Sequence, residues 1–216
     1  MIHPDAYVFD LDGTLLDTIA DLADAMNDAL ARRGFPPQSV EVCKRLVGNG
    51  SEEFVRGALP QNARDPETIA AVLEDFGDAY ADTWNCKTRP FDGIPELLTE
   101  LNGRGIPIAV LSNKSDARVQ EAVRHYFGER HFVDVRGDRA GVPLKPDPQA
   151  ALEIANALGT APEATALVGD TCTDMRTAAA AGMVPVGVLW GFRGERELRD
   201  SGARRIVEHP RDLLAE

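Results

Sequence analysis

Two aspartates near the start of the chain have the spacing of a metal or phosphate site. Asp10 and Asp12 directly follow the apolar stretch Ala6–Phe9, and Gly13 and Thr14 come next. Two carboxylates this close repel each other unless a cation or a proton separates them. Mg²⁺ commonly binds one or two carboxylates together with a substrate phosphate. The pair therefore indicates a magnesium site, although an acidic loop or a helix N-terminus that favours negative charge would also explain it.

A hydroxyl and an amide follow the next strand-like stretch, 106–111. Ser112 and Asn113 could hold phosphate oxygens there, assisted by backbone N–H groups of the helix that follows. Both residue types are also common helix N-caps, and capping is compatible with phosphate binding.

A lysine and two further carboxylates occur later in the chain, and we expect them at strand ends as well. Lys145 lies beside two prolines that stiffen its backbone, so it could offer a fixed cation to a phosphate and to an aspartate nucleophile. Asp170 and Asp174 follow the stretch Thr165–Val168. A surface lysine and capping aspartates are the simpler interpretations of each signal alone. Four such signals, in order, at four strand ends favour a single catalytic site.

The elements that must position these residues alternate between strands and helices. Short apolar stretches with strand character are separated by amphipathic helical patterns; the stretches are 6–9, 106–111, 132–135, 165–168, 184–189 and a weaker one at 204–207. This alternation predicts an α/β fold with a parallel sheet covered on both faces. Ligands of such sheets bind at the carboxyl ends of the strands, where the polar residues lie.

The stretch from about residue 16 to residue 90 has no strand signal. Its apolar residues recur at helical spacing, which predicts four helices. We therefore expect a core domain of residues 1–15 and 91–216, with an all-helical cap of residues 16–90 inserted after the first strand.

The polar residues together resemble the four motifs of the haloacid dehalogenase superfamily. Its DxDGT motif matches residues 10–14, and the later motifs match Ser112-Asn113, Lys145, and Gly169-Asp170 with Asp174. The resemblance extends over essentially the whole chain and implies a Rossmann-like core with a small helical cap. Residues 47–50, 112–114 and 187–192 particularly resemble the phosphoglycolate phosphatase branch.

The resemblance also implies a role for each motif residue. Asp10 would be the nucleophile that forms an aspartyl-phosphate, and Asp12 the general acid and then base. Magnesium would be bound by the carboxylates of Asp10 and Asp170, by the backbone carbonyl of Asp12, and by Asp174 directly or through water. The remaining motif residues would bind phosphate; these are Gly13, Thr14, Ser112, Asn113 and Lys145. The implied activity is hydrolysis of a small phosphate ester, with phosphoglycolate favoured.

The core motifs bind groups that every candidate ester shares, so the cap must select the substrate. Arg45 and Arg56 could bind a carboxylate of the substrate, although a solvated helix face would also explain them. A sugar phosphomutase or a pyrophosphatase of the same superfamily would share the core motifs. A phosphate-sensing binding module is the alternative outside enzymes. Cys172 lies between two expected ligands, where packing is favoured over a redox role.

Composition and charge limit the partners. The net charge is −12, from 35 acidic and 23 basic residues, which disfavours nucleic acid. No apolar run approaches the ~20 residues of a membrane span. The start of the chain shows no signal peptide, and three scattered cysteines indicate a reducing compartment. We therefore expect a cytoplasmic monomer or homodimer that acts on a small phosphorylated metabolite, away from membranes.

Overall fold

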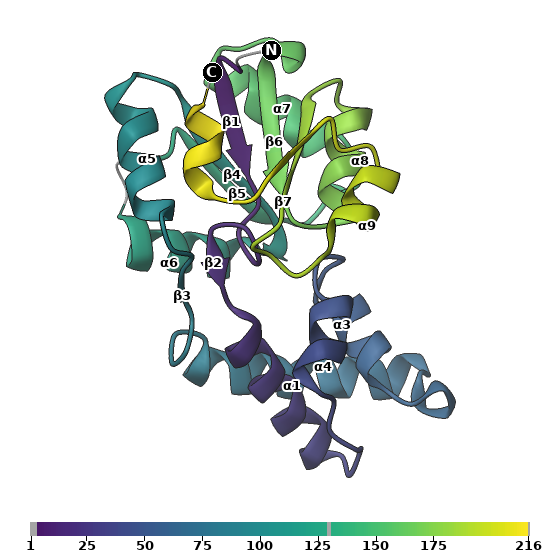
Figure 1. Cartoon of the computed structure of the whole chain (residues 1–216). Helices are drawn as coiled ribbons and strands as arrows, with labels where there is room; N and C mark the ends of the chain where they lie inside the picture. Colours follow the sequence, from purple (N-terminus) through teal and green to yellow (C-terminus); the bar gives the residue numbers. More distant parts are fainter. Residues whose placement is uncertain (1–3, 129–130, 216) are drawn as a thin grey trace. The chain divides into compact units, whose positions relative to one another are not determined.

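The computed structural model describes residues 4–128 and 131–215, and the chain forms two compact units (Figure 1). One unit consists of Met1–Leu16 and Pro90–Glu216, and the other of Asp17–Arg89. The two segments that connect them, β2 (Leu16–Asp17) and β3 (Arg89–Pro90), pair as a two-stranded sheet. No helix in the described part of the chain is long and apolar enough to cross a membrane.

A six-stranded parallel sheet forms the centre of the larger unit (Figure 1). Its strands, in chain order, are β1 (Ala6–Phe9), β4 (Ile108–Ser115), β5 (Asp134–Asp138), β6 (Thr165–Gly169), β7 (Val184–Val188) and β8 (Arg205–Val207). Their spatial order is β5-β4-β1-β6-β7-β8, and every neighbouring pair is parallel. Numbered among themselves, these strands follow the order 3-2-1-4-5-6 of a Rossmann fold. The predicted Rossmann-like parallel sheet is confirmed.

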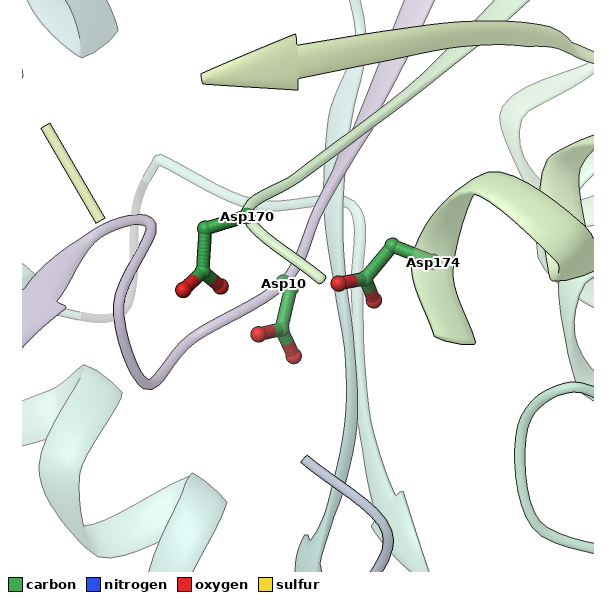
Figure 2. Close-up of side chains that lie close together, drawn as sticks. All are labelled: Asp10, Asp170 and Asp174. Atoms are coloured by element: carbon green, nitrogen blue, oxygen red, sulfur yellow. The ribbon is translucent and has the colours of Figure 1, made fainter. Parts of the chain in front are cut away.

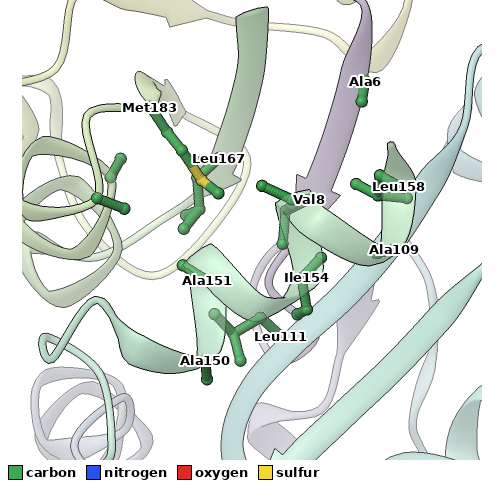
Figure 3. Packing of buried hydrophobic residues seen from close by; sticks show 13 residues of the cluster. Ala6, Val8, Ala109, Leu111, Ala150, Ala151, Ile154, Leu158, Leu167 and Met183 are labelled. Atoms are coloured by element: carbon green, nitrogen blue, oxygen red, sulfur yellow. The ribbon is translucent and has the colours of Figure 1, made fainter. Parts of the chain in front are cut away.

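Helices connect the strands of this unit. They are α5 (Ile94–Gly103), α6 (Asp116–Phe127), α7 (Gln149–Leu158), α8 (Cys172–Ala180) and α9 (Glu195–Asp200), with the 3₁₀ helices η2 (Pro162–Ala164) and η3 (Pro210–Leu214). The apolar residues of α7 recur at positions that form one stripe of a helix, and this stripe is buried. It packs with inward-facing residues of β1, β4 and β6 in a single apolar cluster (Figure 3). The cluster fixes the three strands whose ends carry the polar motifs.

The opposite face of the sheet is anchored near the C-terminus. The Tyr7 hydroxyl donates a hydrogen bond to the carbonyl of Leu213 in η3 over 3.1 Å, and its ring stacks with that of Phe9. Helix α5 contacts η3, and its apolar side chains are buried. Both faces of β1 are therefore covered, as the uninterrupted burial of this strand requires.

The register of the sheet brings three strand ends to one edge. Phe9 pairs with Val110 on one side and with Val168 on the other. Asp10, Leu111 and Gly169 therefore come next at the same level of the sheet. The sequence predicted that β4 would end at residue 111, but it continues to Ser115, with an irregular register against β5. Residues 112–114 thus belong to a distorted strand end.

The smaller unit is mainly helical, as predicted, but its two ends belong to β2 and β3, although no strand was predicted within residues 16–90. Its helices are α1 (Ile19–Arg32), α2 (Val40–Leu46), α3 (Ser51–Ala58) and α4 (Pro66–Thr83), with the 3₁₀ helix η1 (Gln61–Ala63). Helix α1 packs along α4, and both bury their apolar stripes. Asp21 of α1 is buried and accepts hydrogen bonds from the backbone N–H groups of Lys87 and Thr88 and from the Thr88 hydroxyl. These bonds fix the start of α1 to the segment that leads into β3.

Candidate active site

Three carboxylates converge at the carboxyl edge of the sheet (Figure 2). Asp10 follows β1, Asp170 follows β6, and Asp174 lies in the first turn of α8. One oxygen from each lies within 4.8 Å of the others, and all three residues are buried. The central position of β1 between β4 and β6 causes this convergence, because parallel strands end at the same edge.

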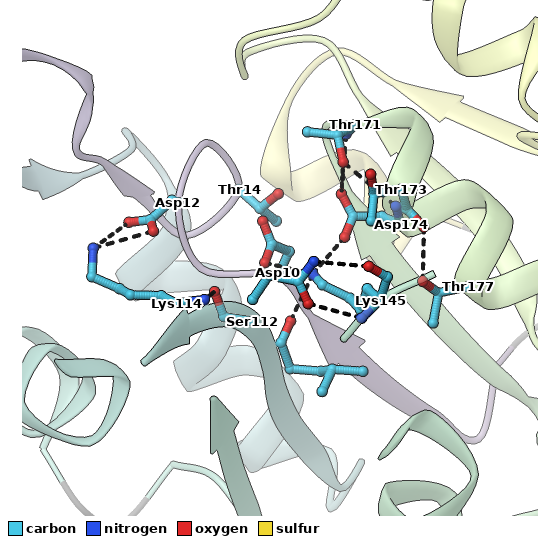
Figure 4. A network of polar contacts seen from close by, with 12 residues as sticks. Asp10, Asp12, Thr14, Ser112, Lys114, Lys145, Thr171, Thr173, Asp174 and Thr177 are labelled. Atoms are coloured by element: carbon cyan, nitrogen blue, oxygen red, sulfur yellow. Dashed lines mark hydrogen bonds and ion pairs between the residues drawn. The ribbon is translucent and has the colours of Figure 1, made fainter. Parts of the chain in front are cut away.

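Lys145 lies among these carboxylates. Its Nζ donates hydrogen bonds to Oδ1 of Asp10 over 2.8 Å, to Oδ1 of Asp174 over 2.7 Å, and to the carbonyl of Leu111 over 3.0 Å (Figure 4). All three donor positions of the ammonium are thus used, and only 3% of the side chain is exposed. The lysine is held as a fixed internal cation.

Burial and mutual repulsion shift the acidity of the cluster. Burial raises the pKa of Asp10 to about 7; Lys145 opposes this shift, and Asp174 adds to it. Burial, Asp10 and Asp174 raise the pKa of Asp170 well above its ordinary value. Burial disfavours the charge on Lys145, but Asp10 and Asp174 outweigh this effect and raise its pKa. Ionising all three carboxylates in the metal-free site is therefore unfavourable in free energy.

The charges of the cluster fit a divalent cation. When all three carboxylates are ionised, the cluster with its one ammonium carries a net charge of −2. An uncompensated charge of this size is unfavourable in a buried site, and a divalent cation would neutralise it. The donors are all carboxylate oxygens, which are hard ligands of the kind that Mg²⁺ prefers. The residues present therefore fit magnesium, and Asp10, Asp170 and Asp174 would hold it.

Neighbouring groups orient two of the carboxylates. The Thr14 hydroxyl donates to Oδ1 of Asp170 over 3.3 Å, and the backbone N–H of Phe192 donates to Oδ2 over 2.8 Å. Oδ2 of Asp174 accepts from both the N–H and the hydroxyl of Thr171, as part of a capping box at the start of α8. Asp174 thus caps its helix with one oxygen and contacts Lys145 with the other.

Asp12 lies apart from the three-carboxylate cluster. Its two oxygens contact Nζ of Lys114 at 3.1 and 3.2 Å, and both side chains are about one-tenth exposed. The Asp12 side chain points toward Lys114, away from the Lys145 network (Figure 4). This arrangement separates the two aspartates of the first motif. Lys114 was not predicted to contact either of them, although it directly follows the Ser112-Asn113 pair.

The polar pair at the end of β4 also contacts its surroundings. The amide group of Asn113 donates to the Lys145 carbonyl over 2.9 Å and accepts from the Lys145 N–H over 2.8 Å. Asn113 therefore holds the backbone of the lysine in place. Ser112 is buried and accepts a 3.3 Å hydrogen bond from the N–H of Lys114. Phosphate binding by Ser112 and Asn113 stays a prediction.

The two arginines expected to bind substrate lie in the helical unit. Arg45 is in the last turn of α2. Arg56 of α3 donates to Glu52 over 2.6 Å and to Glu53 over 3.0 Å, so its guanidinium is paired within its own helix. Their role in substrate binding stays a prediction. Cys172 is the first residue of α8 and is half-buried, with no disulfide partner in the described residues.

Comparison with known proteins places this geometry in a family. A family model for haloacid dehalogenase-like hydrolases matches residues 4–182. The chain is 31% identical over 215 residues to phosphoglycolate phosphatase 1 of Pseudomonas aeruginosa, covering 98% of this chain and 79% of that protein. It is 32% identical over 212 residues to the N-acetylmuramic acid 6-phosphate phosphatase of the same species, covering 97% and 92%.

A solved structure agrees along nearly the whole chain. The crystal structure of a protein from Lactobacillus delbrueckii subsp. bulgaricus, proposed to be a phosphoglycolate phosphatase, superposes with a TM-score of 0.92. The two sequences are 33% identical, and the match covers 99% of this chain and 97% of the other. With its parallel sheet, its converging carboxylates and these matches, the chain belongs to the haloacid dehalogenase-like hydrolases.

Proposed function

We propose that the protein is a magnesium-dependent phosphomonoesterase that hydrolyses phosphoglycolate through an aspartyl-phosphate. The observation that carries this proposal is the buried cluster of Asp10, Asp170 and Asp174 around Nζ of Lys145. A nucleophilic carboxylate, ligands for a divalent cation and a fixed cation are the groups that phosphoryl transfer to an aspartate needs. Bound magnesium would neutralise charge between these carboxylates and the phosphoryl oxygens.

Asp10 would attack phosphorus with one carboxylate oxygen. A P–O bond to Asp10 forms, and the P–O bond to the alcohol breaks. Lys145 orients the Asp10 carboxylate through the 2.8 Å contact and would also stabilise charge on the phosphoryl group. In the second step water attacks the aspartyl-phosphate, which releases inorganic phosphate and restores Asp10.

Asp12 would move the protons of both steps. In its protonated form it would donate to the departing alkoxide, and as a carboxylate it would then accept a proton from the attacking water. Its position supports this separate role, because its carboxylate contacts Lys114 and takes no part in the Lys145 network. The two aspartates of one short loop would thus divide nucleophilic and acid–base chemistry between them.

The names of the relatives support a class of substrate. Phosphoglycolate and N-acetylmuramic acid 6-phosphate are both phosphate monoesters that carry a carboxylate. A cationic side chain that binds this carboxylate would favour such esters over neutral ones. Arg45 and Arg56 are the candidates in the helical unit. Phosphoglycolate is the preferred substrate of the proposal, and N-acetylmuramic acid 6-phosphate is the second candidate.

A substrate panel tests the proposal. Phosphate release would be measured with magnesium on phosphoglycolate, N-acetylmuramic acid 6-phosphate, glucose 6-phosphate and pyrophosphate, with the Asp10→Asn variant as the control. The highest kcat/KM is expected on phosphoglycolate, and excess chelator is expected to abolish release. Preference for pyrophosphate, or transfer of phosphate between sugar positions without release, would replace the proposal with a pyrophosphatase or a mutase. No turnover of any ester would contradict it.

A further inference from the structure

Three consecutive residues after β7 approach the loop that carries the first motif. Trp190, Gly191 and Phe192 lie between β7 and α9 and are half-buried. The motifs assign them no function, and packing alone would explain two aromatic side chains at this position. Trp190 and Phe192 nevertheless make specific hydrogen bonds to Thr14 and Asp170, and Gly191 leaves the space that Asp170 occupies.

Trp190 fixes the neighbour of Asp170. Its indole N–H donates a 2.9 Å hydrogen bond to the carbonyl of Thr14. Thr14 is fully buried, and its hydroxyl donates to Oδ1 of Asp170. A tryptophan in one loop therefore holds the threonine that orients a carboxylate at the end of another strand.

Gly191 leaves the space in which Asp170 lies. A Cβ at Gly191 would be 2.3 Å from the Cβ of Asp170 and 2.4 Å from the carbonyl oxygen of Gly13. A Cβ at Gly13 would in turn be 2.4 Å from Oδ2 of Asp170. The Asp170 side chain is thus confined between two glycines. At Gly191 the requirement is one of space, because its φ is not in the left-handed region.

Phe192 contributes its backbone. Its N–H donates to Oδ2 of Asp170 over 2.8 Å, while Thr14 donates to Oδ1. Each carboxylate oxygen has about two acceptor positions, so one donor to each leaves acceptor capacity for a cation. Both oxygens of the Asp170 carboxylate are therefore oriented by a hydrogen bond, and each can still bind a cation.

We propose that Trp190-Gly191-Phe192 is a positioning segment that fixes Asp170 for magnesium and thereby sets the affinity of the site for the metal. The inference rests on the proposed function only in its choice of magnesium as the ion. Groups that orient a metal ligand typically change metal affinity about 10–100-fold when they are altered. A segment that only packed would change the stability of the fold and leave the affinity of the folded protein unchanged.

A pair of glycine substitutions in the same loop tests the proposal. Gly191→Ala places a methyl group against Asp170, whereas a Cβ at Gly194 meets no atom within 4 Å, so Gly194→Ala is a matched control. Magnesium dissociation constants would be measured by calorimetry on the full chain, and metal-free melting temperatures recorded alongside. We expect magnesium binding to be weakened about 10–100-fold in Gly191→Ala and unchanged in Gly194→Ala.

A milder variant keeps the test decisive if Gly191→Ala does not fold. Trp190→Phe removes one neutral hydrogen bond and should weaken magnesium binding about threefold to tenfold. Trp84 directly follows α4 in the helical unit, so Trp84→Phe is the control and should bind magnesium like the unaltered protein. Folded variants at 190 or 191 that keep the unaltered affinity would overturn the inference, as would an unaltered protein that binds no magnesium. If the unaltered protein binds magnesium but hydrolyses no ester, the proposed function alone fails.

Discussion

The cations of the two units are held in opposite ways. Lys145, at the sheet edge, is 3% exposed and donates to two buried carboxylates and a carbonyl. Arg56, in the helical unit, is 38% exposed and contacts two glutamates of its own helix. A buried charge must keep its partners, because an unpaired charge there is strongly unfavourable, whereas exposed pairs contribute little. The sheet edge therefore holds its cation in a fixed position, whereas Arg56 could change partners at little cost in free energy.

The largest expected effect is at Asp10. Asp10→Asn removes the proposed nucleophile and a magnesium ligand while keeping an oxygen that can accept from Lys145. Turnover of phosphoglycolate should fall below about 10⁻⁴ of the unaltered rate. Phosphate release measures this loss, and circular dichroism checks that the fold is retained. A variant that still hydrolyses phosphoglycolate with magnesium at a tenth of the original rate would rule out the aspartyl-phosphate.

Asp12→Asn should distinguish the role of Asp12 in proton transfer from the role of Asp10 as nucleophile and magnesium ligand. It removes proton transfer but keeps the backbone carbonyl that is expected to bind magnesium. Turnover should fall about 10²–10⁴-fold, while magnesium affinity, measured by calorimetry, stays near that of the unaltered protein. An equal loss of metal affinity in Asp10→Asn and Asp12→Asn would remove the distinction between them.

The acidity of Asp10 predicts a pH dependence of metal binding. Burial raises its pKa to about 7, so the metal-free folded protein holds a proton on this group at lower pH. Magnesium requires the carboxylate, so its apparent affinity should fall at least about tenfold for each pH unit below 7. The raised pKa of Asp170 would make this fall steeper. Calorimetry at a series of pH values measures this slope, and a flat affinity between pH 5 and 7 would contradict it.

The same shift affects stability with the opposite sign. A carboxyl whose folded pKa is raised stabilises the fold fully below its ordinary pKa of 3.8, and this contribution is lost as the pH rises through about 7. The Asp10 contribution to the metal-free melting temperature should therefore decline from pH 5 to 7, while stabilisation by added magnesium increases. Metal-free Asp10→Asn should show a shallower decline, because asparagine does not titrate.

The sequence predicts the strand ends better than the contacts between loops. Asp10 and Asp170 directly follow apolar stretches, and parallel strands bring such positions to one edge. Lys145 was also predicted at a strand end, but it lies in the loop between β5 and α7, and Asp174 lies in the first turn of α8. The predicted α/β fold class is confirmed, because the predicted apolar stretches form the strands of one parallel sheet. The distorted end of β4 at residues 112–114 was not predicted, because an irregular register leaves no periodic signal.

Two contacts near the site join residues that are far apart in the sequence, and no local sequence pattern predicts such contacts. Lys114 contacts Asp12, 102 positions earlier in the chain, and Trp190 contacts Thr14, 176 positions earlier. Both residues belong to stretches that resemble one branch of the family. That resemblance was the signal that could have identified them, but it did not specify which atoms they would contact.

The smallest expected effects on turnover are in the helical unit. Arg45→Glu and Arg56→Glu each reverse one charge that could meet the substrate carboxylate. Loss of one charge-assisted contact costs ~1.5–3 kcal/mol, or roughly ten- to a hundredfold in kcat/KM on phosphoglycolate. Hydrolysis of p-nitrophenyl phosphate, which lacks a carboxylate, should hardly change. Measuring both esters in each variant therefore separates substrate recognition from damage to the shared chemistry.

Arg32→Glu provides the matched control for these reversals. Arg32 lies in the same unit and pairs with Asp28 four residues earlier at 2.6 Å, much as Arg56 pairs with Glu52. Its reversal changes the net charge by the same amount and also breaks an ion pair within a helix, but it removes no proposed substrate contact. A loss on phosphoglycolate that is as large in Arg32→Glu would reflect the field of the whole surface, which added salt would screen. Losses confined to Arg45→Glu or Arg56→Glu would assign the carboxylate contact to that side chain, and no selective loss in either would place substrate selection outside these two arginines.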